Sequence, residues 1–416
     1  MTRAASSERS FRPAELPAAA LGALAALLFL AAWWGLHHGF YARDTIVDTP
    51  VYRSYGDRIA AGEVPYRDFR LEYPPGALPV FALPALGADT SFDRYRRRFE
   101  GLMAGSGVAL LGLTAATLAL LRAARRRMVA ALAFAALAPL ALGSVMLSRF
   151  DLWPAALTAA ALAAIVAGRD RLGSATLALA VAAKLYPGVL VPLAAVWVWR
   201  RRGRREAFVC GGIFLAVLAA CYLPFLALGP FGVAESLGRQ LSRPLQLESL
   251  GAAVLLALHH LGALQISMES SHGSQNVAGL PGVVVGIVQT AVQAGVLVAV
   301  WVAFARGRME PERLVTYAAA TVLAFVALGK VLSPQFLIWL VPLVPLVRGR
   351  RGLAASALLG ASLVLTQLWF PFRYWDFALR FDETASWLVL ARDVVLVAAL
   401  AVLLLPARAP AWRRAP

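Results

Sequence analysis

Long apolar runs separated by short polar stretches recur along the whole chain. An α-helix needs about 20 mostly apolar residues to cross a bilayer, and many of the runs approach that length. The pattern predicts an all-α polytopic membrane protein with about twelve spans, within a range of ten to thirteen. The expected spans are residues 17–36, 99–121, 129–147, 152–168, 172–186, 187–199, 206–228, 280–305, 313–331, 334–347, 352–371 and 385–405.

Some of these spans are too short to cross a membrane as straight helices. Only 28 residues separate Arg171 from Arg200, where two full spans need about 40. The sequence Tyr186-Pro187-Gly188 interrupts this stretch, so either two short helices meet at a bend or the segment re-enters the membrane. A similar break follows at 333–335. Broken backbone at membrane depth is tolerated only inside protein or along a cavity, so we expect both breaks to line one cavity.

Two longer polar segments, residues 37–98 and 229–279, stand between the spans of this single transmembrane domain (1–416). Each contains an apolar stretch, 73–87 and 250–264, that could either cross the membrane or lie in its interface. Four prolines favour a short interfacial helix for the first stretch. We expect the loop acids Asp57, Asp68 and Asp89 to be ordinary solvated groups paired with nearby arginines.

Composition excludes a water-soluble protein, since 60% of the residues are hydrophobic and only 15% are charged. The net charge of +17 at first suggests nucleic acid, but the arginines cluster between apolar runs and form no basic surface, so no nucleic-acid partner is expected. This distribution is typical of cytoplasmic loops and predicts a plasma-membrane protein with both termini inside. The clusters fall at 122–127, 169–171, 200–205, 306–308, 348–351 and 408–414.

The chain has only two lysines, Lys184 and Lys330, among 40 basic residues, and each lies within a few residues of a break. A cation at membrane depth is costly and is by default a functional-site hypothesis. The simpler interpretation is a lysine that reaches the interface and does no chemistry. Arg392 and Asp393 lie in the last expected span, and as sequence neighbours on a helix they are not expected to face each other.

Six short motifs in fixed order resemble glycosyltransferase family 87, the bacterial polyprenyl-phosphomannose-dependent mannosyltransferases of the GT-C superfamily. The resemblance covers roughly residues 17–350. The motifs are Asp48-x3-Tyr52, Gly62-x2-Pro65-Tyr66, Tyr73-Pro-Pro, Arg149-Phe-Asp151-Leu-Trp-Pro, Ala183-Lys184-Leu-Tyr-Pro and Lys330-Val-Leu-Ser-Pro-Gln.

The resemblance implies a GT-C-like membrane hexosyltransferase of the cell envelope, working on the outer face. It would move a sugar, mannose in this family, from a polyprenyl-phosphate-sugar donor to a hydroxyl of a lipid-glycan or polysaccharide acceptor. Inversion at the sugar and no metal or other cofactor are also implied. The family's catalytic base, an Asp early in the first outer loop (37–98), maps onto Asp48, with Asp44 as the second candidate.

The donor of such an enzyme has an anionic head, and cations at shallow depth would stabilise the charge that develops on its phosphate. The candidates for this role are Lys184, Lys330, Arg149 and Arg243. Asp151 could orient Arg149 or bind sugar hydroxyls, or it could be an ion-pair partner in a loop. The residues expected to bind substrate are Tyr52, Tyr66, Tyr73, Asp151, Tyr186 and Gln335.

Two other functions would account for part of the pattern. A transporter or flippase of a lipid-linked sugar would also place charges on broken helices, but it predicts no base in the outer loop. A non-catalytic membrane scaffold would leave both lysines unexplained.

Overall fold

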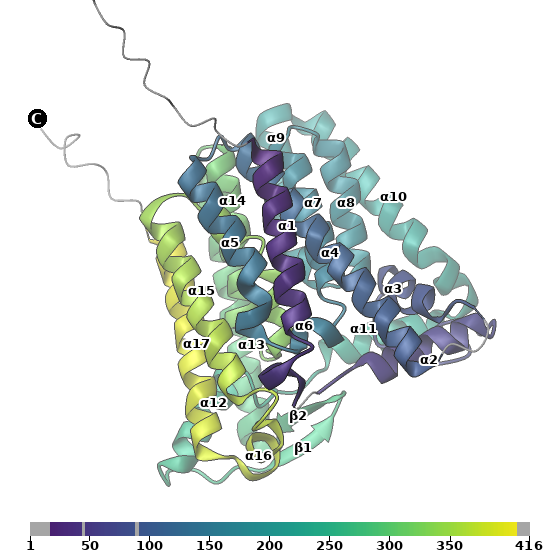
Figure 1. The fold of residues 1–416 in the computed structure, drawn as a ribbon, viewed down its shortest axis with the longest axis vertical. Coiled ribbons are helices and arrows are strands. Elements are labelled where there is room, and N and C mark those ends of the chain that lie inside the picture. Colours follow the sequence, from purple (N-terminus) through teal and green to yellow (C-terminus); the bar gives the residue numbers. More distant parts are fainter. Residues whose placement is uncertain (1–16, 44–45, 88–90, 406–416) are drawn as a thin grey trace, which may run out of the picture.

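The computed structural model describes residues 17–43, 46–87 and 91–405. They form a bundle of helices whose loops at one end are elaborated into short helices and a small hairpin (Figure 1). Asp44 and Asp89 lie outside the described residues.

Six helices are long and apolar enough to cross a membrane by length and composition. At about 1.5 Å per residue, each is long enough for most or all of a hydrocarbon core about 30 Å thick. They are α1 (Ala18–Gly35), α4 (Phe92–Leu120), α10 (Arg204–Leu228), α13 (Gly279–Arg306), α15 (Gly349–Trp369) and α17 (Glu383–Leu404). The protein is therefore a multi-pass membrane protein.

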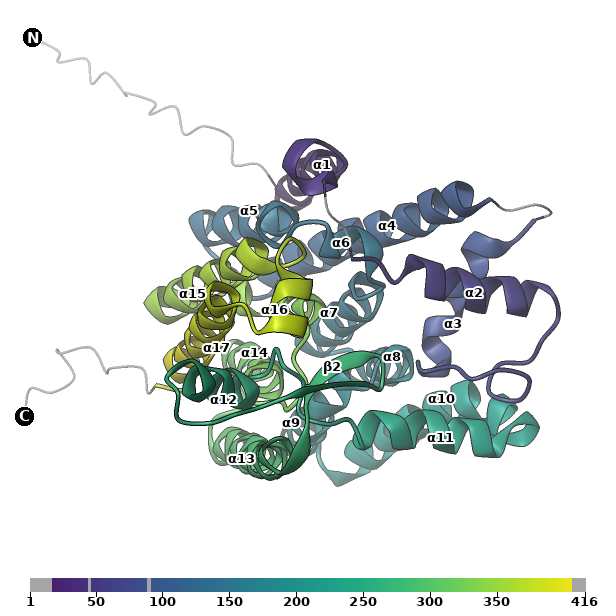
Figure 2. The ribbon, with the colours of Figure 1, turned by 90° about the horizontal axis from the view of Figure 1, so that it is seen from below.

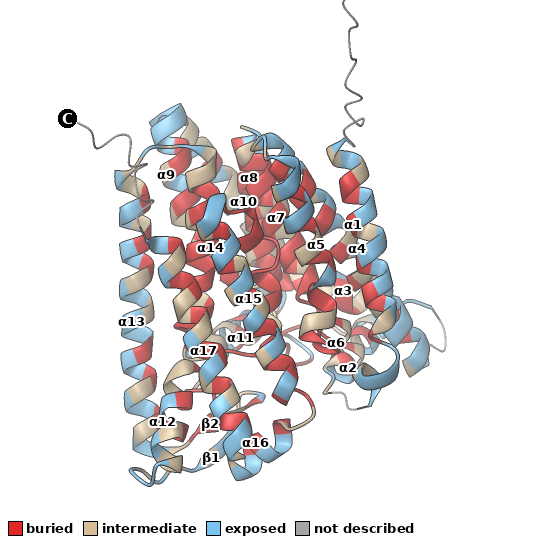
Figure 3. Cartoon of the chain, turned by 60° about the vertical axis from the view of Figure 1, so that its left-hand side comes forward, coloured by how far each residue is buried: buried red, intermediate tan, exposed pale blue. Residues whose placement is uncertain are grey.

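Five further helices, 12 to 18 residues long, complete the interior of the bundle. They are α5 (Arg125–Leu142), α7 (Leu152–Val166), α8 (Asp170–Ala183), α9 (Val191–Arg202) and α14 (Pro311–Ala327). Figure 3 shows buried residues concentrated in this interior, whereas α13 is exposed along most of its length. Every expected span overlaps helix, but 334–347 holds only the 3-10 helices η5 (Pro334–Trp339) and η6 (Val344–Leu346). The number of crossings, expected to be about twelve, stays a prediction.

Both expected breaks are present. The helix α8 ends at Ala183, and the 3-10 helix η4 (Tyr186–Leu190) leads into α9, so two short helices meet at a bend. The second break follows α14, where side-chain amides of α13 satisfy the freed carbonyls: Gln289 donates to Gly329 at 2.8 Å and Gln293 to Phe325 at 2.6 Å. Internal partners of this kind make irregular backbone tolerable at membrane depth.

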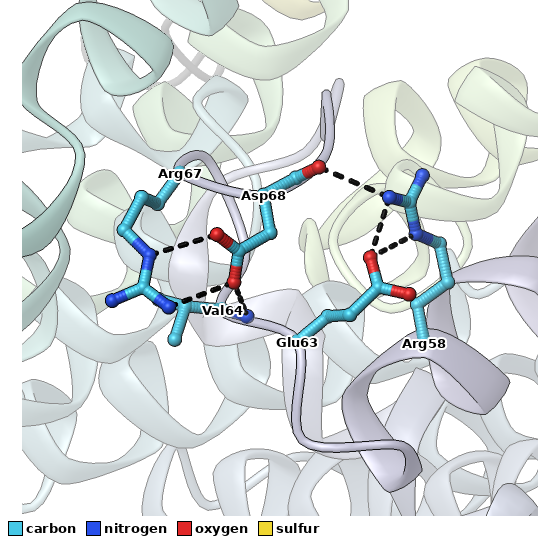
Figure 4. A network of polar contacts seen from close by, with 5 residues as sticks. All are labelled: Arg58, Glu63, Val64, Arg67 and Asp68. Atoms are coloured by element: carbon cyan, nitrogen blue, oxygen red, sulfur yellow. Dashed lines mark hydrogen bonds and ion pairs between the residues drawn. The ribbon is translucent and has the colours of Figure 1, made fainter.

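Segment 37–98 folds into short elements at one end of the bundle. They are η1 (Gly39–Ala42), α2 (Thr49–Ala60), η2 (Pro75–Ala77), α3 (Leu78–Ala82) and η3 (Leu83–Ala85). The apolar stretch 73–87 thus holds short helices broken by prolines. Exposed ion pairs tie the loop after α2 together: Arg58 contacts Glu63 at 2.5 Å, and Arg67 contacts Asp68 at 2.8 Å (Figure 4).

The loop acids behave as expected of solvated groups. Asp68 also accepts the Val64 backbone N–H at 2.7 Å, and the hydrogen bonds from Arg67 and Val64 lower the pKa of Asp68 to about 2. Asp57 pairs with Arg53 one helical turn away, at 3.1 Å.

Segment 229–279 contributes two helices and an antiparallel hairpin to the same end (Figure 2). Within the hairpin Met268 is opposite Val277 and Ser271 is opposite Ser274. The all-helical expectation missed these strands. The elements are α11 (Pro230–Leu241), α12 (Leu250–His260), β1 (Met268–Ser271) and β2 (Ser274–Val277); the short helices α6 (Val145–Ser148) and α16 (Tyr374–Arg380) lie nearby.

The arginine-rich loops gather at the opposite end and bond to one another. Arg127 contacts Glu312 at 2.7 Å, and Arg171 contacts Glu206 at 2.7 Å. Arg200 donates to the Gly307 carbonyl at 2.9 Å. One end of the bundle is thus basic, as the positive-inside pattern requires.

One expectation about the last span is wrong. The Nε of Arg392 lies 2.7 Å from the carboxylate of the adjacent Asp393, and both side chains are fully buried. Arg392 also donates to the backbone carbonyl of Glu248 at 2.5 Å. Both charges are removed from bulk solvent, so the pair closes locally although helical geometry points the two side chains apart.

Candidate active site

A cavity of about 570 Å³ opens among the loops at the end of the bundle away from the arginine clusters. Both breaks line it, as expected, together with parts of segments 37–98 and 229–279. Ten of the residues expected to form the site line this cavity: Asp48, Tyr52, Tyr73, Arg149, Asp151, Lys184, Tyr186, Arg243, Lys330 and Gln335.

The other two candidates are not part of this lining. Asp44 lies outside the described residues. Tyr66 adopts a positive φ of 68° and packs with Phe69 and Val233 in a small separate core. Its hydroxyl donates to the carbonyl of Tyr73 at 2.5 Å, so it supports a residue of the cavity wall.

Asp48 stands at the beginning of α2, where Pro50 sets the first helical turn. Its carboxylate does not cap the helix but forms an ion pair with Arg149. Tyr52, one turn further on, donates to its other oxygen at 3.3 Å. Asp48 is half-buried and lines the cavity, so its carboxylate is held in place with one side open to a ligand.

The guanidinium of Arg149 is buried at the cavity wall between α6 and α7. Desolvation lowers the pKa of Arg149 to about 10, although the nearby carboxylates of Asp151 and Glu248 oppose the shift. The side chain therefore stays cationic at neutral pH and serves as a fixed positive partner for Asp48.

Asp151 pairs with Lys184, and Arg149 pairs with Asp48. One oxygen of Asp151 accepts both from the Lys184 ammonium at 2.6 Å and from the Trp339 indole at 2.6 Å. The ammonium also lies 4.6 Å from the ring centre of Phe150 and 5.2 Å from that of Trp339. Tyr186 stacks on Trp339 at 4.0 Å, so this cluster joins the two breaks. Lys184 therefore already has a carboxylate partner and aromatic neighbours.

Lys330 and Arg243 have a different environment. The ammonium of Lys330 donates to the carbonyl of Leu241, at 3.3 Å, and to no other group that the structure describes. Within the described parts of the chain, neither side chain has a carboxylate within ion-pair distance, although both line the cavity. The Nε of Arg243 is buried there without a hydrogen-bond partner. These two cations are available to an anion.

Further residues line the cavity that the sequence analysis did not select as candidates. Gln240 donates to the Glu72 carbonyl at 2.9 Å, and His272 at the tip of the hairpin lies 3.4 Å from Ser242. Gln240 reaches the cavity from α11, whereas His272 reaches it from the hairpin, which the sequence did not predict. The set comprises Glu72, Arg239, Gln240, Gln246, Glu248, His272, Gln275, Trp339 and Tyr374. Among the residues that the structure describes, His, Cys, Asp and Glu side chains form no group suited to a metal ion.

The model of glycosyltransferase family 87 matches residues 71–334, well over half of the chain. The chain belongs to glycosyltransferase family 87. The match confirms the resemblance indicated by the ordered motifs, and the protein is a glycosyltransferase. The matched region includes Arg149, Lys184, Arg243 and Lys330, whereas Asp48 precedes it.

Among solved structures, this family 87 chain is similar to the crystal structure of ArnT from Cupriavidus metallidurans bound to undecaprenyl phosphate. The two chains are 14% identical with a TM-score of 0.47, and the similarity covers 92% of this chain and 76% of that one. No curated protein sequence matches the chain.

Proposed function

We propose that this protein transfers a hexose, mannose, from a polyprenyl-phosphate-sugar donor to a hydroxyl of a lipid-glycan or polysaccharide acceptor. Family 87 membership supports glycosyl transfer. The observation that carries the proposal is one cavity lined by a loop carboxylate, Asp48, and by two cations, Lys330 and Arg243, that have no carboxylate partner among the described residues. A base and an anion site in one cavity are what this reaction needs.

The donor phosphate is placed at Lys330 and Arg243. A guanidinium offers a planar pair of N–H donors, and an ammonium offers a compact charge. Together they suit the phosphodiester of the donor, which carries one negative charge. Lys184 and Arg149 add positive potential, but each is largely neutralised by its own aspartate. As the sugar leaves, the cations stabilise the charge that grows on the phosphate.

In the proposed reaction Asp48 removes the proton of the acceptor hydroxyl. The oxygen then attacks the anomeric carbon, and the bond from that carbon to the phosphate oxygen breaks with its electron pair. The products are the glycosylated acceptor and the polyprenyl phosphate, and the configuration at the anomeric carbon is inverted. Arg149 and Tyr52 hold the carboxylate in place for proton transfer.

The polyprenyl tail is placed between α11 and α13. Leu241 at the end of α11 and Thr290 on α13 both line the cavity, and Leu241 is 77% exposed. The short helix α9 packs against both α10 and α13. Because α9 begins at Val191, we expect it to leave a gap at its cavity end, between α11 and α13. A tail leaving there would contact apolar side chains of α13 such as Ile287.

The membrane orientation is part of the same proposal. The basic end of the bundle is placed in the cytoplasm, which puts both termini there and the cavity on the outer face of the plasma membrane. This arrangement lets a lipid donor and a lipid-glycan acceptor meet at the membrane surface.

The test uses purified protein in lipid nanodiscs, polyprenyl-phosphomannose and a lipid-glycan acceptor. We expect transfer and release of polyprenyl phosphate, with a loss of at least about 100-fold in kcat for Asp48→Asn. Asp57→Asn, which removes an exposed acid from the same helix, is the matched control and should retain full activity. Full activity of Asp48→Asn would overturn the assignment of the base. Movement of the donor across the membrane without release of polyprenyl phosphate would instead identify a flippase.

A further inference from the structure

The cavity wall contains a carboxyl group, Glu248, that neither the base nor the phosphate site uses. Glu248 lies between the end of α11 and the start of α12, and only 3% of its surface is exposed. One carboxyl oxygen accepts from the amide of Gln246. The other, Oε1, has no hydrogen-bond partner among the residues described. A buried carboxyl oxygen without a partner is unfavourable unless a ligand or solvent supplies one.

The backbone around Glu248 is held firmly. The N–H of Leu247 donates to Gln275 on β2 at 3.0 Å, and that of Ser249 donates to Gln246 at 3.0 Å. Arg392 donates to the carbonyl of Glu248 itself. The segment therefore runs beside the hairpin as a third, partly paired strand and then turns into α12.

The side chain of Glu248 is not needed to neutralise Arg392. That guanidinium pairs with Asp393 and reaches only the main-chain carbonyl of Glu248. Removing the carboxyl would leave the Arg392 contacts in place. The backbone of Glu248 therefore makes structural contacts, whereas Oε1 of its carboxyl group has no partner among the described residues.

The carboxyl of Glu248 feels the charge of nearby arginines, but the side chains that form hydrogen bonds beside it are uncharged. The amide of Gln246 also donates to the Ser333 hydroxyl at 2.9 Å, and the Tyr374 hydroxyl donates to the Gln275 amide oxygen. All four residues line the cavity. Amides, hydroxyls and a carboxyl group in one patch offer both donors and acceptors, which is the chemistry that recognises a polyol.

We propose that Glu248 is a sugar-binding residue of the cavity, with its free carboxyl oxygen hydrogen-bonded to a hydroxyl of the transferred sugar or of the accepting sugar. This inference rests on the proposed function, since it assumes that the cavity holds sugars. Burial raises the pKa of Glu248 to about 8 in spite of Arg392 and Arg149, so the group is largely protonated at neutral pH. In that form it can donate as well as accept.

The test compares two lipids, one with the sugar and one without it. Binding of polyprenyl-phosphomannose and of bare polyprenyl phosphate is followed by tryptophan fluorescence, since Trp339 and Trp375 line the cavity. The KM for the acceptor is measured in parallel. We expect Glu248→Ala to weaken phosphomannose binding about tenfold with bare polyprenyl phosphate unchanged, or to raise the acceptor KM about tenfold. The first result assigns the hydroxyl to the donor sugar, and the second assigns it to the acceptor.

Equal weakening of both lipids without a change in acceptor KM, or no change in any of these constants, would overturn the proposal. Glu248→Met keeps the length of the side chain without an oxygen atom, should give the same result, and covers the case in which the alanine variant does not fold. Glu312→Gln, which removes a glutamate from the pair with Arg127, is the matched control and should change none of the constants. Activity of the wild-type protein and of Asp48→Asn tests the proposed function separately, so the two failures can be told apart.

Discussion

The two lysines of this chain lie beside similar breaks and line the same cavity, yet their surroundings differ in kind. Lys184 is held by Asp151 at 2.6 Å and surrounded by aromatic rings, with Trp339 donating to the same carboxylate. Lys330 touches one carbonyl at 3.3 Å. A buried cation that already has a carboxylate contributes to the shape of the site, whereas a cation without one can bind a phosphate.

The largest expected effect concerns stability at the first break. Lys184→Met leaves the fully buried Asp151 without its cation, and breaking such a pair costs about 3–5 kcal/mol. We expect a marked fall in the Tm of the purified protein. The double variant Lys184→Met/Asp151→Asn should recover more than half of the loss, because neither partner then remains as an unpaired charge.

Arg171→Gln is the matched control for this prediction. It breaks a pair of nearly the same length, Arg171 with Glu206 at 2.7 Å, but at an exposed position, so the Tm should barely change. A Tm of Lys184→Met equal to that of the wild type would contradict a structural role for Lys184.

The second effect is on donor binding and belongs to the other break. Lys330→Gln and Arg243→Gln should each raise the KM for polyprenyl-phosphomannose about 10- to 100-fold, because each removes a charge-assisted hydrogen bond to the phosphate. The Tm should change little, since the ammonium of Lys330 donates one long hydrogen bond and the Nε of Arg243 has no partner among the described residues. Lys330→Arg should restore part of the affinity because it keeps the charge. Wild-type donor KM in both glutamine variants would contradict the phosphate site.

The smallest effect is a dependence of donor binding on pH. Burial raises the pKa of Glu248 to about 8, and Arg243 is among the cations that oppose this shift. Below that pH Glu248 is protonated and Arg243 faces no negative charge from it. As the pH rises through 8 the carboxyl loses its proton and competes with the phosphate. We expect the donor KM to rise about threefold from pH 7 to pH 9.

Glu248→Gln should abolish this rise, since its side chain does not titrate. The free energy of unfolding should also fall as the pH rises. The folded-state pKa of Glu248 lies above its value in the unfolded chain, so its contribution to stability is complete at acid pH and is lost as the pH rises toward 8. A donor KM that rises equally in wild type and Glu248→Gln would assign the effect to another group.

Much of this architecture could be predicted because it depends on local sequence. Apolar runs, prolines and arginine clusters located the helices, the breaks near Lys184 and Lys330, and the basic end of the bundle. The rule that broken backbone must line a cavity or be packed in protein then predicted that both breaks share one cavity, and the structure has them there. The family resemblance added Asp48, whose role as base stays a prediction.

Pairing between distant elements could not be predicted. Asp151 lies two residues from Arg149, but it pairs with Lys184, 33 residues further along the chain. Which cation a carboxylate meets depends on how α7 and α8 pack, and sequence spacing does not contain that information. The same holds for Glu248, which reaches the cavity because residues 245–247 run beside a hairpin that has no apolar pattern.

The most direct measurement is a structure of the protein with polyprenyl phosphate bound in lipid nanodiscs. We predict the phosphate within hydrogen-bonding distance of the Lys330 ammonium and the Arg243 guanidinium, with the Lys184–Asp151 pair intact and the tail between α11 and α13. A phosphate bound to Lys184, with Asp151 displaced and Lys330 still on the Leu241 carbonyl, would contradict it.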